Sequence, residues 1–327
     1  EALGLLQAVL AADPDHVGAL IHAADIDRRQ GRFDIALERL NRAVQMDGTH
    51  ALAHTRRAHV LLELNRYPEA LSALDVALRL DARSTEALHY LGSAYSRLGR
   101  HHEAVQAFSA ALAMAPDLQG TLHNRGLSYR ELGRFEEAAI DYDQLAQLNP
   151  DFPFVQGNAF HTRLQTCDWT GYSSALRQIQ ERAAVQKPSC LPLYGLVISD
   201  DPEMQRQIAS SCASLMYPPR HEGFPPIAHP RHERIRVAYL SGDFRQHPVA
   251  SHVIGLFDAH DRTRFDISAW SFGPDIDDAM RTRMREAMGG LRDVHAVSDA
   301  DLVRQLDRKS TRLNSSHVSE SRMPSSA

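Results

Sequence analysis

The chain has 327 residues, 43% hydrophobic and 24% charged, which is typical of a soluble globular protein with room for two domains. Its formal net charge of −5 indicates no nucleic-acid partner, and no apolar run approaches the ~18–20 residues of a membrane span. The three cysteines lack CxxC spacing, which favours reduced thiols in a cytoplasmic protein over a disulfide or a metal site.

A period of 34 residues organises the first 150 residues. The segments GRFDIAL, NRYPEAL, GRHHEAV and GRFEEAA begin at positions 31, 65, 99 and 133. Small residues recur in register within each unit, at Ala24, Ala58, Gly92 and Gly126 and again at Ala36, Ala70, Ala104 and Ala138. Because antiparallel helices approach closely only where side chains are small, this pattern predicts stacked helix pairs joined by turns that need Gly or Asn.

This pattern resembles tetratricopeptide (TPR) repeats, with four complete repeats and part of an earlier one over residues 1–150. The resemblance implies a superhelix whose groove is lined by the first helix of each pair. The side chains expected to face that groove suit hydrogen bonding to an extended peptide, although any one of them could instead lie on a solvated helix face. They are His22, Asp25, Arg56, His59, His89, Tyr90, Arg97, His123 and Asn124.

The repeat period ends at Pro150, and residues 151–233 are expected to form a helical connector with a Pro-rich linker. One helical stretch is predicted over 152–184 and another from Asp201 to Met216. Prolines at 218, 219, 225, 226 and 230 forbid regular structure and predict a domain boundary near 217–233.

Residues 234–306 alternate between strand and helix patterns. Strands are predicted at 234–242, 265–273 and 291–297, and helices at 249–260, 277–288 and 298–306. This alternation predicts a parallel, doubly wound sheet, in which ligands bind at the carboxyl ends of the strands.

The loop Ser241–His247 follows the first predicted strand and therefore lies at that edge. Pro248 fits the first position of the next helix, so His247 stands at the helix entrance. From the residues alone, His247 suits a helix cap as well as an active-site residue. The loop has no GxGxxG pattern, which disfavours a dinucleotide site.

The order of these parts resembles a known enzyme family. The TPR repeats, a connector containing CDWT (167–170), RIRVAYLSGDFRQHPVASH (234–252) and DRTRFDISAWSFGPDIDD (261–278) are similar to the O-linked N-acetylglucosamine transferases of glycosyltransferase family 41. The resemblance covers nearly all of residues 15–306. It implies a mostly α fold followed by a partial α/β segment, the Rossmann-like N-terminal lobe of a GT-B catalytic domain.

The family's activity is transfer of a sugar, usually from UDP-N-acetylglucosamine, to Ser or Thr of a protein, with inversion and without a metal or other cofactor. The resemblance makes His247 an active-site histidine, acting as base or as positioning group, and gives Asp243 an orienting role. Acceptor proteins or peptides are the expected partners, held in the groove at His22, Arg56, His59, His89, Tyr90, His123 and Asn124, with no nucleic acid or membrane. Better-known members carry an asparagine ladder, whereas the equivalent residues here are His22, Arg56, Tyr90 and Asn124.

The final segment, DRKSTRLNSSHVSESRMPSSA (307–327), has no apolar periodicity and resembles a translated sequencing adapter. We expect it to be non-native and disordered, with the catalytic region truncated and the fragment inactive; a genuine Ser-rich tail is the alternative. The competing functional hypothesis is a TPR adaptor that binds proteins without catalysis.

Overall fold

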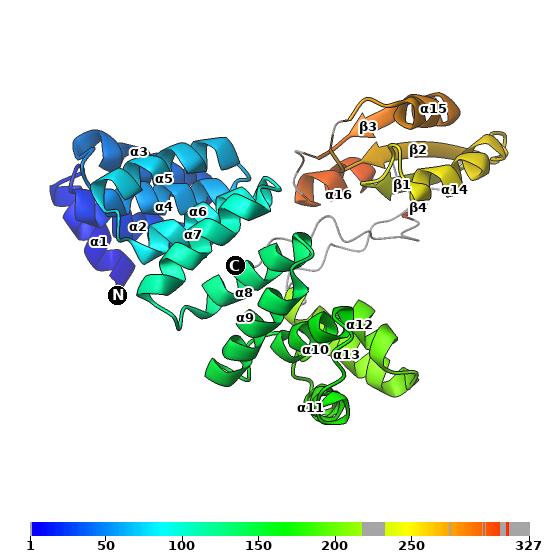
Figure 1. The fold of residues 1–327 in the computed structure, drawn as a ribbon. Helices are drawn as coiled ribbons and strands as arrows, with labels where there is room; N and C mark the ends of the chain where they lie inside the picture. The colour runs from blue at the N-terminus through cyan, green and yellow to red at the C-terminus, as the bar shows by residue number, and fades with distance from the viewer. Residues whose placement is uncertain are drawn as a thin grey trace. The chain divides into compact units, whose positions relative to one another are not determined.

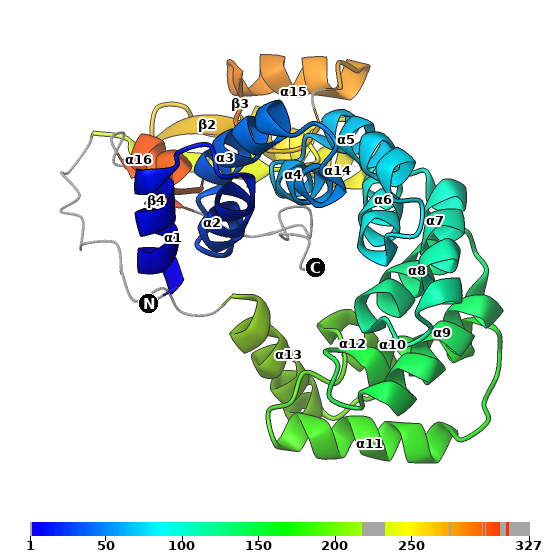
Figure 2. The same cartoon turned by 90° about the vertical axis from the view of Figure 1, so that its left-hand side faces the viewer.

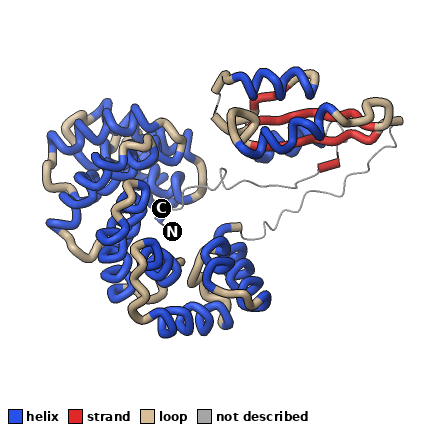
Figure 3. Tube along the Cα trace, turned by 45° about the vertical axis from the view of Figure 1, so that its right-hand side comes forward, coloured by secondary structure: helices blue, strands red, loops and turns tan. Residues whose placement is uncertain are grey.

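A computed structural model of the chain describes residues 2–217, 233–274, 276–295, 297, 299–307 and 312–313. Contacts divide the chain into two units, residues 1–219 and 220–327, which are described separately. Within the described residues the first unit contains helices and no strands, and the strands belong to the second (Figure 3).

The first unit begins with stacked helix pairs at the predicted 34-residue period. A single helix, α1 (Ala2–Ala12), precedes them. The pairs are α2 (Val17–Arg29) with α3 (Phe33–Met46), α4 (Ala51–Glu63) with α5 (Tyr67–Leu80), α6 (Thr85–Arg97) with α7 (His101–Met114), and α8 (Gln119–Glu131) with α9 (Phe135–Leu148). Figure 2 shows α2, α4 and α6 along the inner side of an arc and α3, α5 and α7 along its outer side.

The predicted small residues lie where the paired helices meet. Ala24, Ala58 and the four alanines of the second helices are all 0% exposed. A Cβ on Gly92 would lie 2.5 Å from the Phe108 ring, and one on Gly126 would lie 2.9 Å from the Tyr142 ring. Since no real Cβ is found so close to another atom, an alanine at either glycine would push the paired helices apart.

The turns inside each pair confirm the need for Gly or Asn. Gly31, Gly99 and Gly133 have φ between 70° and 73°, and Asn65 occupies the equivalent turn with φ 57°. This left-handed conformation costs glycine nothing and is tolerated by asparagine better than by most residues.

The connector forms α10 (Val155–Gln165), α11 (Tyr172–Ala184), α12 (Pro192–Ile198) and α13 (Pro202–Met216). The helix predicted from Asp201 is confirmed as α13. The single stretch predicted over 152–184 is wrong in detail, because Cys167 and Gly171 adopt positive φ and divide it into two helices. All three cysteines are free, and Cys190 and Cys212 are buried.

The second unit contains the predicted parallel sheet. Its elements are β1 (Ile235–Ser241), α14 (Pro248–Asp258), β2 (Phe265–Ser271), α15 (Ala279–Met288), β3 (Leu291–Asp293) and α16 (Asp299–Asp307). The strand order is β3-β2-β1-β4, and every pairing is parallel. Figure 1 shows the strands with helices beside them.

Helices pack on both faces of this sheet, as the doubly wound prediction requires. Ile267 and Ala269 of β2 pack with Phe257 of α14 and Met284 of α15. On the opposite face, Ala238 and Trp270 pack with Leu302 and Leu306 of α16. Alternate residues of each strand point to opposite faces, so one strand contributes to both clusters.

Two sequence expectations concern residues that are only partly described. The predicted boundary at 217–233 lies almost entirely outside the described residues, as do 308–311 and 314–327 of the predicted disordered tail. Arg312–Leu313, in contrast, form the two-residue strand β4 against Val237 and Ala238. No strand was expected there; the edge of β1 has unpaired backbone groups that even a short segment can satisfy.

Candidate functional site

The loop between β1 and α14 places His247 at the carboxyl end of the sheet. His247 is the N-cap of α14, where its Nδ1 accepts a hydrogen bond from the backbone N–H of Val249 at 3.2 Å. Pro248 occupies the first helical position, as predicted. The imidazole remains 35% exposed, so one ring combines a structural hydrogen bond with access to solvent.

This cap determines which nitrogen of His247 carries the proton. A neutral imidazole has one N–H and one acceptor nitrogen, and here Nδ1 is the acceptor. The proton of the neutral ring therefore lies on Nε2, which can donate a hydrogen bond but cannot take up a proton. In this arrangement His247 is suited to hold an oxygen atom in place and is not poised as a general base.

Asp243 lies beside His247, with its Oδ2 atom 3.8 Å from Nδ1 of the imidazole. Its carboxylate is 13% exposed and also lies 3.5 Å from the Arg245 guanidinium. The backbone N–H of Asp243 donates to Ser241 Oγ at 3.0 Å, which folds the loop back over the end of β1. The two predicted catalytic residues are thus neighbours, but 3.8 Å is too long for a hydrogen bond.

A contact between two glycines joins this loop to the next one, and sequence reasoning missed it. A Cβ on Gly273 would lie 1.9 Å from the carbonyl oxygen of Gly242. Gly273 follows β2 as Gly242 follows β1, so the only signal in the sequence was a glycine after each strand. Any side chain at Gly273 would separate the two loops at the carboxyl edge.

Sequence reasoning also missed Asp278 and Arg281, whose side chains connect the loops at this edge of the sheet. Asp278 Oδ2 accepts from the backbone N–H of Gln246 at 2.7 Å, while Oδ1 caps α15 through Arg281 N. These backbone hydrogen bonds, from Gln246 first, hold the pKa of Asp278 below its usual range. The Arg281 side chain is buried and donates to Ser271 Oγ at 3.1 Å and Asp293 Oδ2 at 3.0 Å.

A second histidine, His295, lies at the same edge of the sheet, and its Nδ1 atom is a hydrogen-bond donor where that of His247 is an acceptor. Nδ1 of His295 lies 2.6 Å from Asp293 Oδ1, a carboxylate that can only accept while ionised. Burial raises the pKa of Asp293, but hydrogen bonds from His295 and the charge of Arg281 outweigh it and lower the pKa overall. The neutral ring of His295 therefore carries its proton on Nδ1 and leaves Nε2 as an acceptor.

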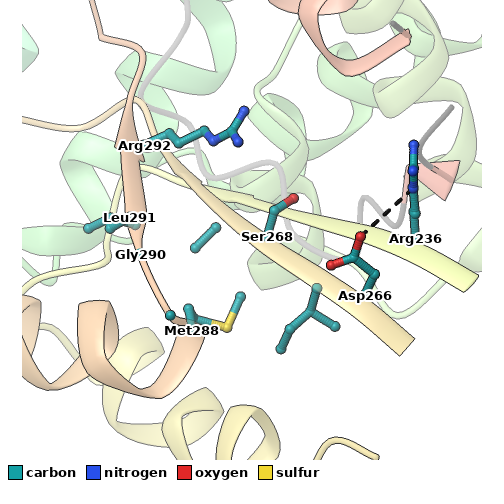
Figure 4. Close-up of a pocket in the computed structure, with 10 residues that line it drawn as sticks. Arg236, Asp266, Ser268, Met288, Gly290, Leu291 and Arg292 are labelled. Carbon is teal, nitrogen blue, oxygen red and sulfur yellow. Dashed lines mark ion pairs between the residues drawn. The ribbon is translucent and has the colours of Figure 1, made fainter. Parts of the chain in front are cut away.

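A cavity of about 450 Å³ opens at the other end of the sheet (Figure 4). It is lined by residues near the amino ends of the strands, where Arg236 and Asp266 form an ion pair at 3.8 Å. The edge of β2 is open here because β3 pairs only with Ala269–Ser271. Ligands of parallel α/β sheets bind at the carboxyl ends, so this cavity is not the candidate catalytic site.

The residues predicted to face the groove occur on α2, α4, α6 and α8, and several bind one another. Arg56 of α4 pairs with Asp25 of α2 at 3.0 Å and with Glu86 of α6. Tyr90 donates to Glu86 at 3.4 Å and stacks on His59 with ring centroids 4.2 Å apart. We call the side of these four helices that turns away from α3, α5, α7 and α9 the inner face of the helix stack. It carries a chain of contacts in which one guanidinium, that of Arg56, meets two carboxylates.

The remaining predicted groove residues lie in different environments. His22 is exposed and Asn124 is half-buried. His89 is mostly buried and bonds Thr121 Oγ1 at 2.9 Å, beside a cavity of about 260 Å³ between the first turns of α6 and α8. His123 packs against Phe152, with ring centroids 5.2 Å apart. Burial lowers the pKa of both His89 and His123 to about 4, so both are neutral at pH 7.

The first half of the chain matches a known repeat family. One family model of the tetratricopeptide repeat matches residues 1–51, 22–85 and 55–119, and another matches 120–152. Residues 1–152 are tetratricopeptide repeats. The TPR array shares its fold with PilF of Pseudomonas aeruginosa, which is 20% identical with a TM-score of 0.50 over 62% of this chain and 92% of that one.

Part of the chain also distantly resembles O-GlcNAc transferases. The probable UDP-N-acetylglucosamine–peptide N-acetylglucosaminyltransferase SEC of Arabidopsis thaliana is 26% identical over 157 residues, which are 42% of this chain and 16% of that protein. An O-GlcNAc transferase mutant of Thermobaculum terrenum is 22% identical, with a TM-score of 0.48 over 80% of this chain and 45% of that one. The chain therefore spans less than half the length of either protein.

None of the helices that the structure describes is both long and apolar enough to cross a membrane.

Proposed function

We propose that this chain is the N-terminal part of a protein O-glycosyltransferase whose TPR groove holds the acceptor polypeptide. The observation that carries the proposal is the half-exposed imidazole of His247, held beside Asp243 at the carboxyl end of β1 in a run, SGDFRQHPVASH, that resembles the O-GlcNAc transferases. The distant similarity to the Arabidopsis enzyme supports the same assignment.

The reaction would join the hydroxyl oxygen of a Ser or Thr to the anomeric carbon of the sugar. The bond from that carbon to the oxygen of the nucleotide diphosphate breaks, the nucleotide leaves with the electron pair, and the hydroxyl proton is released. UDP-N-acetylglucosamine is the donor that the resemblance favours, and the residues that bind it would belong to a second lobe.

His247 would act in this reaction as a hydrogen-bond donor that positions an oxygen of the acceptor or of the sugar. Taking the proton itself would require Nδ1–H in the neutral ring, which would break the bond from Val249 N–H that begins α14. Asp243 would orient the loop, since its backbone N–H donates to Ser241 Oγ at the end of β1. Proton acceptance would then belong to another group.

The competing function is a TPR adaptor without catalysis, and the cap itself favours it, because a helix cap is a sufficient structural role for His247. One substitution separates the two. Asn caps helices well, so His247→Asn keeps the cap while removing the imidazole.

The test uses a longer protein that carries this sequence together with a complete second lobe. Transfer of N-acetylglucosamine from UDP-N-acetylglucosamine to a protein acceptor should fall by ~10²-fold or more in His247→Asn, the scale of a positioned catalytic group. An equal melting temperature would show that folding is intact. Unchanged transfer in His247→Asn would remove His247 from the mechanism, and no transfer by the unmodified protein would favour the adaptor.

A further inference from the structure

The cavity of about 260 Å³ between the first turns of α6 and α8 is called the α6–α8 cavity below. Glu86 and His89 of α6 form one wall, and Leu118, Gly120 and Thr121 at the start of α8 form the other. Most of the surface that lines it is apolar. The Glu86 side chain is 37% exposed, so the cavity is open to solvent on the side where Glu86 lies.

A glycine at the second position of α8 leaves this space open. The 34-residue register places Leu52 at the same position of α4 and Glu86 at the same position of α6. A Cβ on Gly120 would lie 3.7 Å from Cε1 of His89, which is an ordinary van der Waals distance. A side chain therefore fits at position 120, and its absence leaves the Cε1 edge of the His89 ring uncovered.

His89 gives the cavity a fixed, uncharged aromatic wall. Its Nδ1 atom bonds Thr121 Oγ1 at 2.9 Å, and its ring centroid lies 5.4 Å from that of Tyr90 and 5.9 Å from that of Phe108. Burial, aided by the neighbouring His59, lowers the pKa of His89 to about 4. The ring is therefore neutral at pH 7 and does not repel an apolar group through a charge.

Glu86 connects the cavity to the inner face of the helix stack. Its carboxylate accepts hydrogen bonds from the Arg56 guanidinium of α4 and from the Tyr90 hydroxyl at 3.4 Å. Arg56 and Tyr90 are among the residues that the TPR pattern predicts to face the groove. The cavity thus opens beside the path expected for a bound polypeptide, and the charge of Glu86 already has a counter-charge.

From these contacts we infer that the α6–α8 cavity holds an aromatic side chain of the polypeptide bound along the inner face. A cavity of roughly 150 Å³ is enough for benzene, so a volume of about 260 Å³ has room for one aromatic ring. Contact between two aromatic rings adds attraction beyond the burial of apolar area. The inference rests on the part of the proposed function that places a polypeptide in the groove, and it does not depend on sugar transfer.

The test measures peptide binding by the whole chain without any sugar donor. The probes are serine-rich peptides that differ only at one central residue, which is phenylalanine, leucine, lysine or alanine. Each carries fluorescein at the same end, and binding is followed by fluorescence anisotropy. The phenylalanine peptide should bind about tenfold more tightly than the alanine peptide, the scale expected for burying one large apolar side chain.

The other two peptides test the class of the side chain. The leucine peptide should bind more weakly than the phenylalanine peptide, because it lacks the ring contact with His89. Equal affinities of the leucine and phenylalanine peptides would contradict an aromatic preference. Tighter binding of the lysine peptide would show that the Glu86 carboxylate selects a cation, and equal binding of the phenylalanine and alanine peptides would overturn the site.

One substitution that fills the cavity assigns the preference to it. Gly120→Leu places a side chain in the open space on a helical residue that leucine suits, so the protein should fold while losing most of the preference for phenylalanine. Gly18→Leu is the matched control, since Gly18 has the same register position on α2. A full preference in Gly120→Leu, or its loss in Gly18→Leu, would contradict the assignment.

Photo-crosslinking locates the bound side chain on the unmodified chain. With p-benzoylphenylalanine at the central position of the peptide, crosslinks mapped by mass spectrometry should fall within residues 85–89 and 118–121. Crosslinks confined to α2 and α4 would place the aromatic residue elsewhere. Failure of every peptide to bind would overturn both the groove and the cavity, whereas aromatic-selective binding by a protein without transferase activity would overturn only the enzyme.

Discussion

The carbonyl oxygen of Gly242 occupies the space in which a side chain on Gly273 would begin, 1.9 Å from the position of its Cβ. These two glycines follow β1 and β2, and their contact brings together the loops that carry His247 and Asp278. The carboxyl edge of the sheet therefore depends on a backbone approach that only glycine allows.

Replacing Gly273 by alanine should destabilise the protein by about 2 kcal/mol, because the backbone of one loop must move away from the other. Gly255→Ala is the matched control. Gly255 lies in α14 with no atom within 4 Å of its added Cβ, so alanine there should stabilise by up to about 1 kcal/mol. Urea unfolding measures both, and equal effects of the two substitutions would show that the loop contact is unimportant.

The two imidazoles at the carboxyl edge should be opposite tautomers when neutral. Nδ1 of His247 accepts from Val249 N–H, whereas Nδ1 of His295 faces Asp293. Histidine-selective ¹⁵N NMR distinguishes a protonated from an unprotonated ring nitrogen. We expect the proton on Nε2 in His247 and on Nδ1 in His295. A proton on Nδ1 of His247 would restore that residue as a candidate base.

Stability should fall on acidification through the buried histidines of the TPR array. Burial, aided by the neighbouring His59, lowers the pKa of His89 to about 4, and burial, then the charge of Arg130, lowers that of His123 to about 4. Both lie below the value of about 6.5 in an unfolded chain. Between these values the unfolded state binds more protons, so the free energy of unfolding decreases as the pH drops from 7 towards 4 and levels off below 4.

At about pH 5 this linkage amounts to about 2 kcal/mol for each ring. Urea unfolding at neutral and acidic pH measures it. The double variant His89→Gln, His123→Gln should show a flatter pH dependence, since the glutamines do not titrate. A slope as steep in that variant as in the parent would mean that other groups cause the acid sensitivity.

The ion-pair chain on the inner face should contribute measurably to stability. Arg56 is only 22% exposed and bridges Asp25 and Glu86 across three helices, so Arg56→Ala should cost about 1 kcal/mol or more. Arg79→Ala is the control, because the Arg79–Asp75 pair is about two-thirds exposed and should contribute close to nothing. A double-mutant cycle of Arg56 with Asp25 measures the coupling; zero coupling would contradict the bridge.

Local patterns determined much of this protein. The 34-residue period fixed the paired helices because small residues and turn glycines act within one repeat, and alternation of apolar runs predicted the parallel sheet. The position of His247 at a strand end, before a helix that starts with proline, also followed from adjacent residues. Local reasoning erred where a backbone reversal had no strong sequence signal, at Cys167 and Gly171.

Tertiary structure alone decided how the functional side chains are partnered. Arg56 meets Glu86 thirty positions away, Arg130 meets Tyr194 sixty-four positions away, and Gln246 meets Asp278 across two loops. Such contacts depend on the rotation between successive helix pairs and on the order of strands, neither of which is encoded by any one segment. For the same reason, the sequence predicted which residues face the groove but not which of them are already bound to one another.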